Sequence, residues 1–335
     1  MMEHFETNDP LNEEQLSSVE SPIVYPPKFT KEEQPANVWM KSIISLALYL
    51  VLGYYIFHSF TMLLLITAIV MFHELGHFFA MKYFRYNELG IFFIPLLGAY
   101  VSGTKREVSQ KESAIILLAG PLPGIILGSV FYYLSQTNPS LEIANISFDR
   151  IGMLLIFLNL INLFPIYPLD GGQLLNRVFL DEESWVGKVF VFLSAAFLCW
   201  LAWKLNFWVL LIFPGMMLLR LQTDKKFVTV EKRIETEGIN ADVSYENLKD
   251  EDYWKIRNIL IEEHPSFKEF NSTPRFEYHP KEEKIMTTIQ SLLHRHLIQD
   301  VSIAGKILIV LICVAAFAAP WLLNMDMSFF NRFGF

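Results

Sequence analysis

The chemistry of this chain is concentrated in five residues, His73-Glu74-Leu75-Gly76-His77, which directly follow the apolar run at residues 63–72. On a helix, His73 and His77 lie one turn apart on the same face, so both imidazoles can bind a single metal ion. Glu74 lies about 100° around that helix, from where its carboxylate can reach a water bound to the ion. This spacing predicts a metal-dependent hydrolase, since a chance match is expected in only about one such chain in a hundred.

The apolar flank of this motif and the composition of the chain predict a membrane protein. Hydrophobic residues make up 53% of the 335 and charged residues 19%, with a mean hydropathy of +0.33. That composition is typical of a chain that crosses a membrane several times. Polar groups at bilayer depth are costly unless they face a bundle interior, so the motif indicates a functional site. The net charge is −8, and the chain carries no basic stripe that would indicate a nucleic-acid partner.

Seven membrane-spanning helices are predicted from apolar windows of about 20 residues. They lie at about 38–58, 61–83, 112–135, 150–169, 186–203, 206–220 and 302–323. Basic residues cluster between the second and third spans, whereas the 136–149 loop has no Lys or Arg. By the positive-inside rule, we expect the N-terminus and the opening of the site to be cytosolic. Cys199 and Cys313 lie in apolar runs and are interpreted as packing residues.

A third metal ligand is needed, because catalytic zinc sites usually have three protein ligands and one position for water. Asp170 is the best candidate, at the end of the fourth predicted span. Pro165 and Pro168 disrupt helical hydrogen bonding there, and the following Gly171-Gly172 permits unusual backbone angles. Such an opened segment is tolerated at membrane depth where it lines a wet cavity. The alternative is a turn in which Asp170 caps the next helix.

The two motifs together resemble the site-2 protease family of intramembrane zinc metalloproteases. These motifs are H-E-L-G-H within a span and, some ninety residues later, N-x-x-P-x-x-P-L-D-G-G. The resemblance implies a Zn²⁺ ion bound by His73, His77 and Asp170, with Glu74 as the general base. It also implies cleavage of a membrane-embedded peptide bond in transmembrane protein substrates. It covers about residues 61–175, the three-helix catalytic core of the family.

A β-rich segment at about 90–103 resembles the membrane-associated β element of that family. An exposed strand edge can bind an unwound substrate segment by β-augmentation. We therefore expect Gly98, Ala99 and Tyr100 to contact substrate, and Asn162 to hold the same segment through its amide. Simple packing of the hairpin under the core is the alternative interpretation.

One position departs from the family pattern. Ala119-Gly120-Pro121 matches a family motif, but many relatives have Asn where this chain has Gly124. No role based on an Asn side chain can be assigned there. Gly120, Gly124 and Gly128 recur every four residues, which favours close helix packing.

The predicted fold is an all-α polytopic membrane protein of about seven transmembrane helices, with a short β-hairpin and a small, mostly helical soluble insert. Its predicted parts are a mobile cytosolic tail (1–37), an accessory helix (38–60), the metalloprotease core (61–175), an accessory helix pair (176–221), a cytosolic insert (222–300) and a C-terminal helix and tail (301–335). The insert lacks the features of a PDZ module. It is predicted to gate access, to bind a regulatory ligand or to mediate oligomer contacts.

Two other functions compete with proteolysis. A non-catalytic membrane adaptor or chaperone would have lost a ligand or the glutamate, and neither is lost here. A small-solute transporter would have paired discontinuous helices in repeated halves, and only one broken span is found. For a protease, the sequence does not choose between regulated release of a transcriptional regulator and clearance of membrane remnants.

Overall fold

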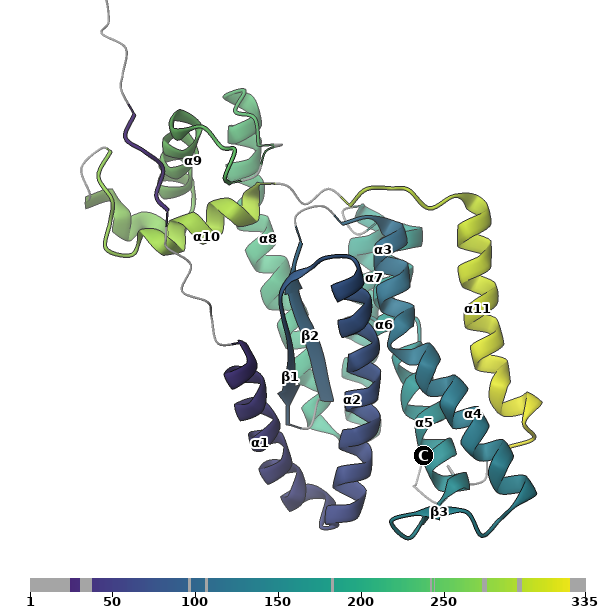
Figure 1. Ribbon diagram of the computed structural model, residues 1–335. Helices are drawn as coiled ribbons and strands as arrows, with labels where there is room; N and C mark the ends of the chain where they lie inside the picture. The colour runs from purple at the N-terminus through teal and green to yellow at the C-terminus, as the bar shows by residue number, and fades with distance from the viewer. Residues whose placement is uncertain are drawn as a thin grey trace, which may run out of the picture.

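The chain forms a bundle of helices with two short antiparallel sheets (Figure 1). The computed structural model describes residues 25–30, 38–95, 98–105, 108–181, 184–241, 243, 245–272, 276–293 and 297–325. Most of the tail that the sequence predicts to be mobile, residues 1–24 and 31–37, therefore lies outside the described residues.

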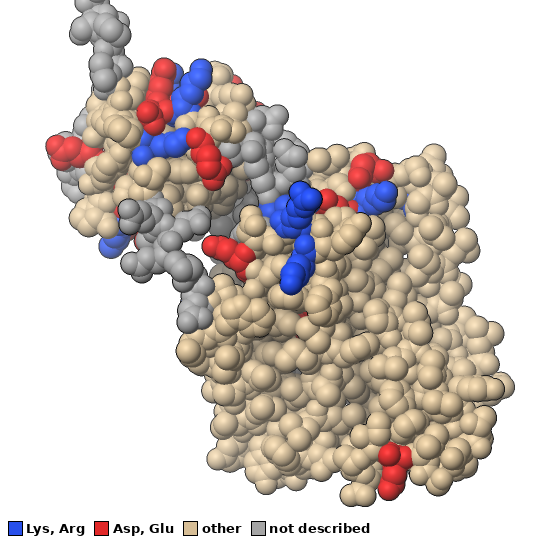
Figure 2. Space-filling view, in the orientation of Figure 1, with Lys and Arg blue, Asp and Glu red and all other residues tan. Residues whose placement is uncertain are grey.

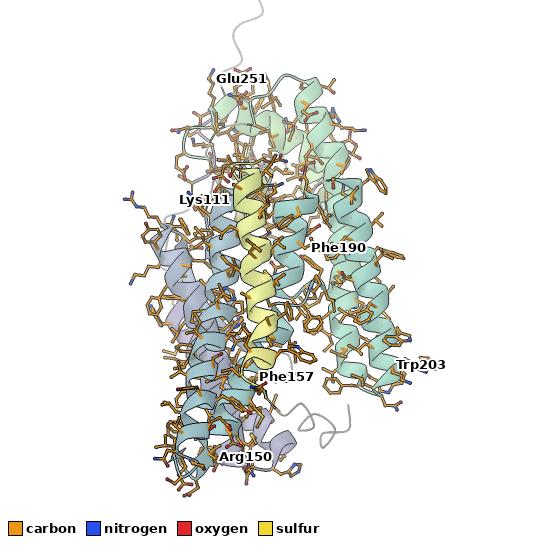
Figure 3. The ribbon with its side chains drawn as sticks, turned by 90° about the vertical axis from the view of Figure 1, so that its right-hand side faces the viewer. Lys111, Arg150, Phe157, Phe190, Trp203 and Glu251 are labelled. Atoms are coloured by element: carbon orange, nitrogen blue, oxygen red, sulfur yellow. The ribbon has the colours of Figure 1, made fainter. Side chains whose placement is uncertain are left out.

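Five helical segments are long and apolar enough to cross a membrane. They are α1 (Val38–Phe57), α2 (Phe60–Tyr83), the consecutive pair α3 (Gln110–Ala119) and α4 (Pro121–Thr137), α7 (Trp185–Lys204) and α11 (Ile303–Leu322). Figure 3 shows Lys111 and Arg150 at opposite ends of the bundle, with Phe190 between these levels. Figure 2 shows few charged side chains on the face of the bundle between its ends. The helices therefore present a continuous apolar band.

The other two predicted spans are shorter than a bilayer requires. Helix α5 (Phe148–Asn162) has 15 residues and is about 22 Å long, against roughly 30 Å of hydrocarbon. It ends early because Pro165 and Pro168 supply no N–H for helical hydrogen bonds. The 206–220 span is the 3₁₀-helix η2 (Trp208–Leu211) followed by the first turns of α8 (Ile212–Thr236), and its apolar stretch ends at Leu219.

The β-hairpin lies between α1 and α2 (Figure 1). Strand β1 (Asn87–Ile94) pairs with β2 (Gly98–Thr104) in antiparallel register, with Ile91 opposite Val101. Gly98 has φ +104°, a left-handed conformation that a residue with a Cβ adopts only with strain. A second sheet, β3 (Glu142–Ile143) with β4 (Ile146–Ser147), closes the turn between α4 and α5.

Helices α4 and α5 approach each other closely along small residues. A Cβ atom added to Gly128 would lie 2.8 Å from the carbonyl oxygen of Gly152, and one added to Gly152 would lie 2.8 Å from that of Gly128. One turn away, Gly124 faces the side chain of Asn159. The predicted packing role of Gly124 and Gly128 is thus confirmed, because no larger side chain fits at this interface.

The chain between α5 and α6 (Asp170–Leu174) forms no helix over residues 163–169. A side chain at Gly171 would collide with the carbonyl group of Leu163, and one at Gly172 with the peptide between Ile166 and Tyr167. The two glycines let the start of α6 pack against this open segment. This contact fixes the position of Asp170. A short π-helix, η1 (Leu175–Leu180), follows.

The described part of residues 222–300 is mainly helical and has its own core. It contains the end of α8, α9 (Asp250–Glu263), the 3₁₀-helix η3 (Pro265–Ser272) and α10 (Glu282–Leu292). Trp254, Phe270 and Ile285 are among its fully buried side chains. Charged side chains gather on the visible face of this region, at one end of the bundle (Figure 2).

Candidate metal centre

Helix α2 brings the two histidines of the motif together. His73 and His77 are 5% and 8% exposed, and their Nε2 atoms lie 3.1 Å apart. This is the outcome expected for positions i and i+4 of a helix, where side chains share one face. Glu74 is also buried, at 6% exposed.

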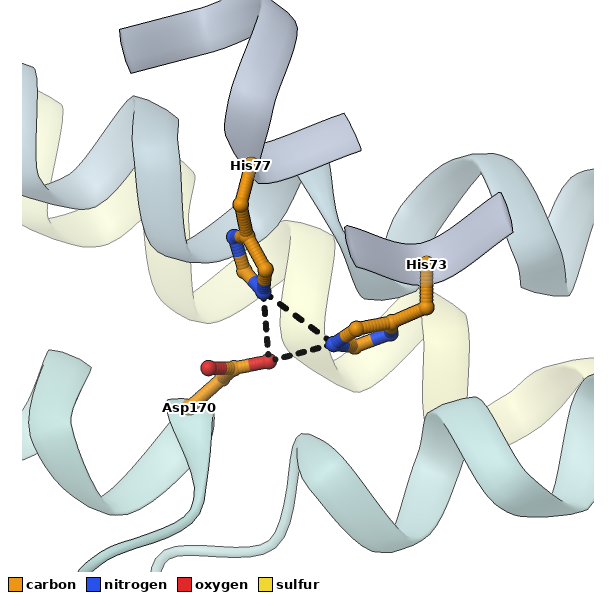
Figure 4. Close-up of side chains that lie close together, drawn as sticks. All are labelled: His73, His77 and Asp170. Carbon is orange, nitrogen blue, oxygen red and sulfur yellow. Dashed lines mark hydrogen bonds and ion pairs between the residues drawn. The ribbon is translucent and has the colours of Figure 1, made fainter. Parts of the chain in front are cut away.

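Asp170 completes the cluster from the start of α6. Its Oδ2 atom lies 3.0 Å from His73 Nε2 and 3.2 Å from His77 Nε2 (Figure 4). Within the described residues, these three form the group whose donor atoms lie close enough to bind one metal ion. The three side chains predicted from two distant motifs therefore meet at one point.

The other ring nitrogens fix how the imidazoles face this point. His73 Nδ1 lies 2.7 Å from Asn159 Oδ1, and His77 Nδ1 lies 2.7 Å from the carbonyl oxygen of Ile116. The amide orientation of Asn159 is set, because its Nδ2 donates to the Leu155 carbonyl at 2.7 Å. Both Nδ1 atoms must therefore donate, which leaves the Nε2 lone pairs directed at each other and at the carboxylate.

Three electron-pair donors that face one another fit a bound cation. Tetrahedral Zn²⁺ with ligand bonds of about 2.0–2.1 Å separates its donor atoms by roughly 3.3 Å. The observed separations of 3.0–3.2 Å are within a few tenths of that value. Two neutral imidazoles and one carboxylate are also a ligand set that zinc accepts.

Gly120 keeps the space beside the Nε2 atoms of His73 and His77 free. A Cβ atom at this position would contact His77 Nε2 and would lie 2.9 Å from His73 Nε2. The glycine lies between α3 and α4, where Pro121 starts a new helix. The helix-packing role predicted for Gly120 is therefore wrong, because this glycine faces the candidate metal centre.

Glu74 connects the centre to the hairpin. The backbone N–H of Val101 in β2 lies close enough to the Glu74 carboxylate to stabilise its negative charge. Because backbone groups alternate along a strand, those of Ala99 lie on the same edge as Val101. Within the described residues, this edge of β2 has no partner strand. An unpaired strand edge thus lies directly beside the buried carboxylate.

The other predicted substrate residues lie in different settings. Gly98 and Tyr100 are opposite Ile94 and Phe92 of β1, so we place their backbone groups on the paired edge. The Tyr100 side chain is half exposed and stacks on Phe92. Asn162 donates to the Leu158 carbonyl of its own helix at 3.3 Å and is partly buried.

Two contributors to the centre were missed by the sequence analysis. Asn159, 1% exposed, orients His73, and it fills the space beside Gly124. The available signal was an amide within an apolar helix, since such a group usually pairs with another polar group. Ile116 contributes only a backbone carbonyl, which no side-chain pattern can reveal.

Comparisons with known proteins find similarity to peptidases over part of the chain. Peptidase family M50 matches residues 61–149, which include His73, Glu74 and His77 but end before Asp170. Stage IV sporulation protein FB of Bacillus subtilis is 26% identical over 183 residues, 52% of this chain and 62% of that protein. A zinc metalloprotease of Methanocaldococcus jannaschii is 28% identical over 135 residues, 39% of this chain and 38% of that protein. This chain therefore spans less than two thirds of either relative.

A solved structure, the site-2 protease from M. jannaschii, aligns with a TM-score of 0.39 and 20% identity, covering 53% of this chain and 84% of that one. The M50 match, the sequence relatives and the apolar helices define the class, an integral membrane protein related to zinc metalloproteases. Within that class, residues 61–149 are similar to peptidase family M50.

Proposed function

We propose that this protein is an intramembrane zinc metalloprotease that hydrolyses peptide bonds within or near transmembrane segments of membrane proteins. The observation that carries the proposal is the convergence of His73, His77 and Asp170 beside Glu74, in a bundle with an apolar surface. Three inward-facing electron-pair donors are costly to bury without a cation. A metal ion is therefore the ligand that this centre fits.

Glu74 is proposed as the general base. A zinc ion in the centre would polarise the scissile carbonyl and acidify its bound water. The Glu74 carboxylate accepts a proton from the attacking water and donates it to the leaving amide nitrogen. The nearby N–H of Val101 puts the carboxylate next to β2, where a substrate backbone would lie.

Substrate binding is proposed along the open edge of β2. A transmembrane helix shields its carbonyl groups through internal hydrogen bonds, so the scissile segment must be extended before attack. The backbone of Ala99 and the neighbouring groups of β2 can pair with that segment. Gly98 and Tyr100 support the strand that carries this edge, and Asn162 is proposed to hold the substrate through its amide.

The proposed substrates are single-pass or hairpin membrane proteins, processed for regulated release or for clearance of remnants. The proposed opening of the site is cytosolic, as the distribution of basic residues predicts. Water must reach the centre from that side, because hydrolysis consumes one water molecule for each bond.

The test is the replacement Glu74→Gln, measured by elemental zinc analysis and by cleavage of a panel of transmembrane substrates. Zinc content should be unchanged, because Glu74 is not a ligand, while the cleavage rate should fall by about 10²–10⁴-fold. Glu142→Gln, at an exposed position in β3, is the matched control and should cleave normally. Turnover retained by the Glu74 variant would contradict the assigned base.

A further inference from the structure

Residues 25–30, with the sequence Tyr-Pro-Pro-Lys-Phe-Thr, lie against the 222–300 region, far from the metal centre (Figure 1). The segment forms neither helix nor strand. Pro26 and Pro27 lack N–H groups and restrict their own φ angles, and each proline also biases the preceding residue toward extended conformations. Such a segment favours the polyproline II conformation and is recognised mainly through its carbonyl groups and rings.

Aromatic donors meet the carbonyl groups of this segment. The pairs are Trp254 Nε1 to the Pro26 carbonyl (2.8 Å), the Tyr278 hydroxyl to the Pro27 carbonyl, and the Tyr245 hydroxyl to the Phe29 carbonyl (2.5 Å). A segment with two prolines lacks the N–H groups needed to pair fully with a β-strand. Its carbonyl groups are bound by side-chain donors instead.

Lys28 is bound by a separate set of oxygen atoms. Its ammonium donates to the carbonyl oxygens of Glu246 (2.6 Å) and Leu248 (2.7 Å), and lies 5.7 Å from the centre of the Tyr245 ring. Its backbone N–H donates to Asp250 Oδ1 at 2.8 Å. These contacts select a cation, since carbonyl and carboxylate oxygens surround the ammonium and the backbone beside it.

The rings on both sides of the prolines are also held. Tyr25 packs edge-on against Phe276 with ring centres 5.3 Å apart, and Phe29 packs edge-on against Tyr278 at 5.4 Å. Tyr278 in turn stacks on Trp254. The surface that receives the segment is therefore lined with aromatic rings, as in grooves that recognise proline-rich peptides.

We propose that the 222–300 region is a recognition module for segments of the type aromatic-Pro-Pro-Lys-aromatic, and that residues 25–30 of the same chain are its ligand. The six hydrogen bonds join residues 216 to 251 positions apart in sequence. Contacts over this separation must offset the entropy of ordering the segment, so a specific ligand explains them better than local packing. The proposal is independent of the protease assignment.

The contact within the full chain is tested by trypsin cleavage after Lys28, followed by mass spectrometry on the detergent-purified protein. The paired change Tyr245→Phe and Tyr278→Phe removes two hydroxyl donors and keeps both rings. Loss of these two hydrogen bonds should accelerate cleavage at least tenfold. Tyr83→Phe, at an exposed residue of α2, is the control. Equal cleavage rates in the wild type and the paired variant would overturn the proposal.

Ligand specificity is tested with a fluorescent peptide of sequence Tyr-Pro-Pro-Lys-Phe-Thr, titrated against full chains. The tail variant Lys28→Ala with Phe29→Ala should bind this peptide at least tenfold more tightly than wild type, because the tethered wild-type segment competes at a millimolar effective concentration. A peptide with both prolines replaced by Ala should bind at least tenfold more weakly. Equal binding of the two peptides, or no binding to the tail variant, would overturn the proposal.

Discussion

The metal centre and the 222–300 region each bury a cluster of charged and polar groups, but the two clusters differ in how their atoms are paired. In the 222–300 region, Arg257 and Glu282 are 2% and 1% exposed. The Arg257 guanidinium donates to both carboxylate oxygens of Glu282, at 2.5 and 3.0 Å. The Tyr253 hydroxyl and the His279 N–H also donate to this carboxylate. Donors and acceptors match, so the network is complete without a ligand.

The metal centre lacks this complementarity. Its Nδ1 donors are used by Asn159 and Ile116, so His73, His77 and Asp170 turn electron pairs toward one another. The comparison teaches that burial alone does not identify a binding site. A buried cluster indicates a ligand when the atoms that face one another are all acceptors or all donors.

The largest effect is expected from removing the anionic donor of the metal centre. Asp170→Asn keeps the side-chain volume but replaces the carboxylate by a weaker neutral ligand. Metal affinity should fall by more than the roughly 10–100-fold that is typical when a residue that only hydrogen-bonds to a metal ligand is replaced. Elemental analysis of the purified protein measures this loss, with Asp149→Asn in α5 as the control. Unchanged zinc content would remove Asp170 from the ligand set.

The second largest effect is expected from breaking the hydrogen-bonded network of Arg257 and Glu282. Arg257→Met leaves the Glu282 carboxylate buried without its main partner, which should cost about 3–5 kcal/mol in stability of the 222–300 region. Hydrogen exchange of α9 and α10 should accelerate while zinc content stays unchanged. Adding Glu282→Leu should restore most of the protection, since the unpaired charge is gone. Loss of zinc in the single variant would contradict the separation of the two clusters.

A smaller effect is expected from the group that orients His73. Asn159→Leu removes the acceptor for Nδ1, so the imidazole loses its fixed tautomer, and metal affinity should fall by about 10–100-fold. Asn159→Asp keeps an acceptor and should recover part of the affinity. Asn162→Leu, three residues later, should leave metal affinity unchanged, because its amide contacts the Leu158 carbonyl. Competition with a chelator of known affinity provides the measurement.

The smallest effect is expected at an exposed counterpart of Arg257. Arg233 forms ion pairs with Glu237, Glu262 and Glu263 while its side chain remains 38% exposed. Solvent screens such pairs, so Arg233→Ala should shift the melting temperature by only a few degrees. A loss of stability as large as that caused by Arg257→Met would show that the number of ion pairs, and not their burial, determines how much stability is lost.

The meeting of His73 and His77 could be predicted from sequence because helix periodicity alone places them on one face. Asp170 could be predicted from its prolines and glycines, which mark where a helix opens. The length of α5 was overestimated, because an apolar window counts residues on both sides of a proline equally. The geometry shows that the helix ends at Asn162, before the first proline.

The docked segment at residues 25–30 could not be predicted. Its polar, proline-containing surroundings are typical of a mobile tail, and all its partners lie more than 200 residues away. Aromatic residues such as Tyr245 and Trp254 give no pattern that distinguishes a core from a groove. Asn159 was missed for a related reason, because a single amide does not reveal which of its neighbours needs an acceptor.

The length of β2 has a mechanical consequence for the proposed reaction. Seven residues of helix span about 10 Å, whereas seven residues paired along Gly98–Thr104 span about 24 Å. Extending such a segment therefore lengthens a membrane-embedded substrate by roughly 13 Å. A bilayer about 30 Å thick has no room for this extra length. One end of the substrate must slide out of the membrane as the scissile bond reaches Glu74, so a bulky domain anchored close to that end would slow cleavage.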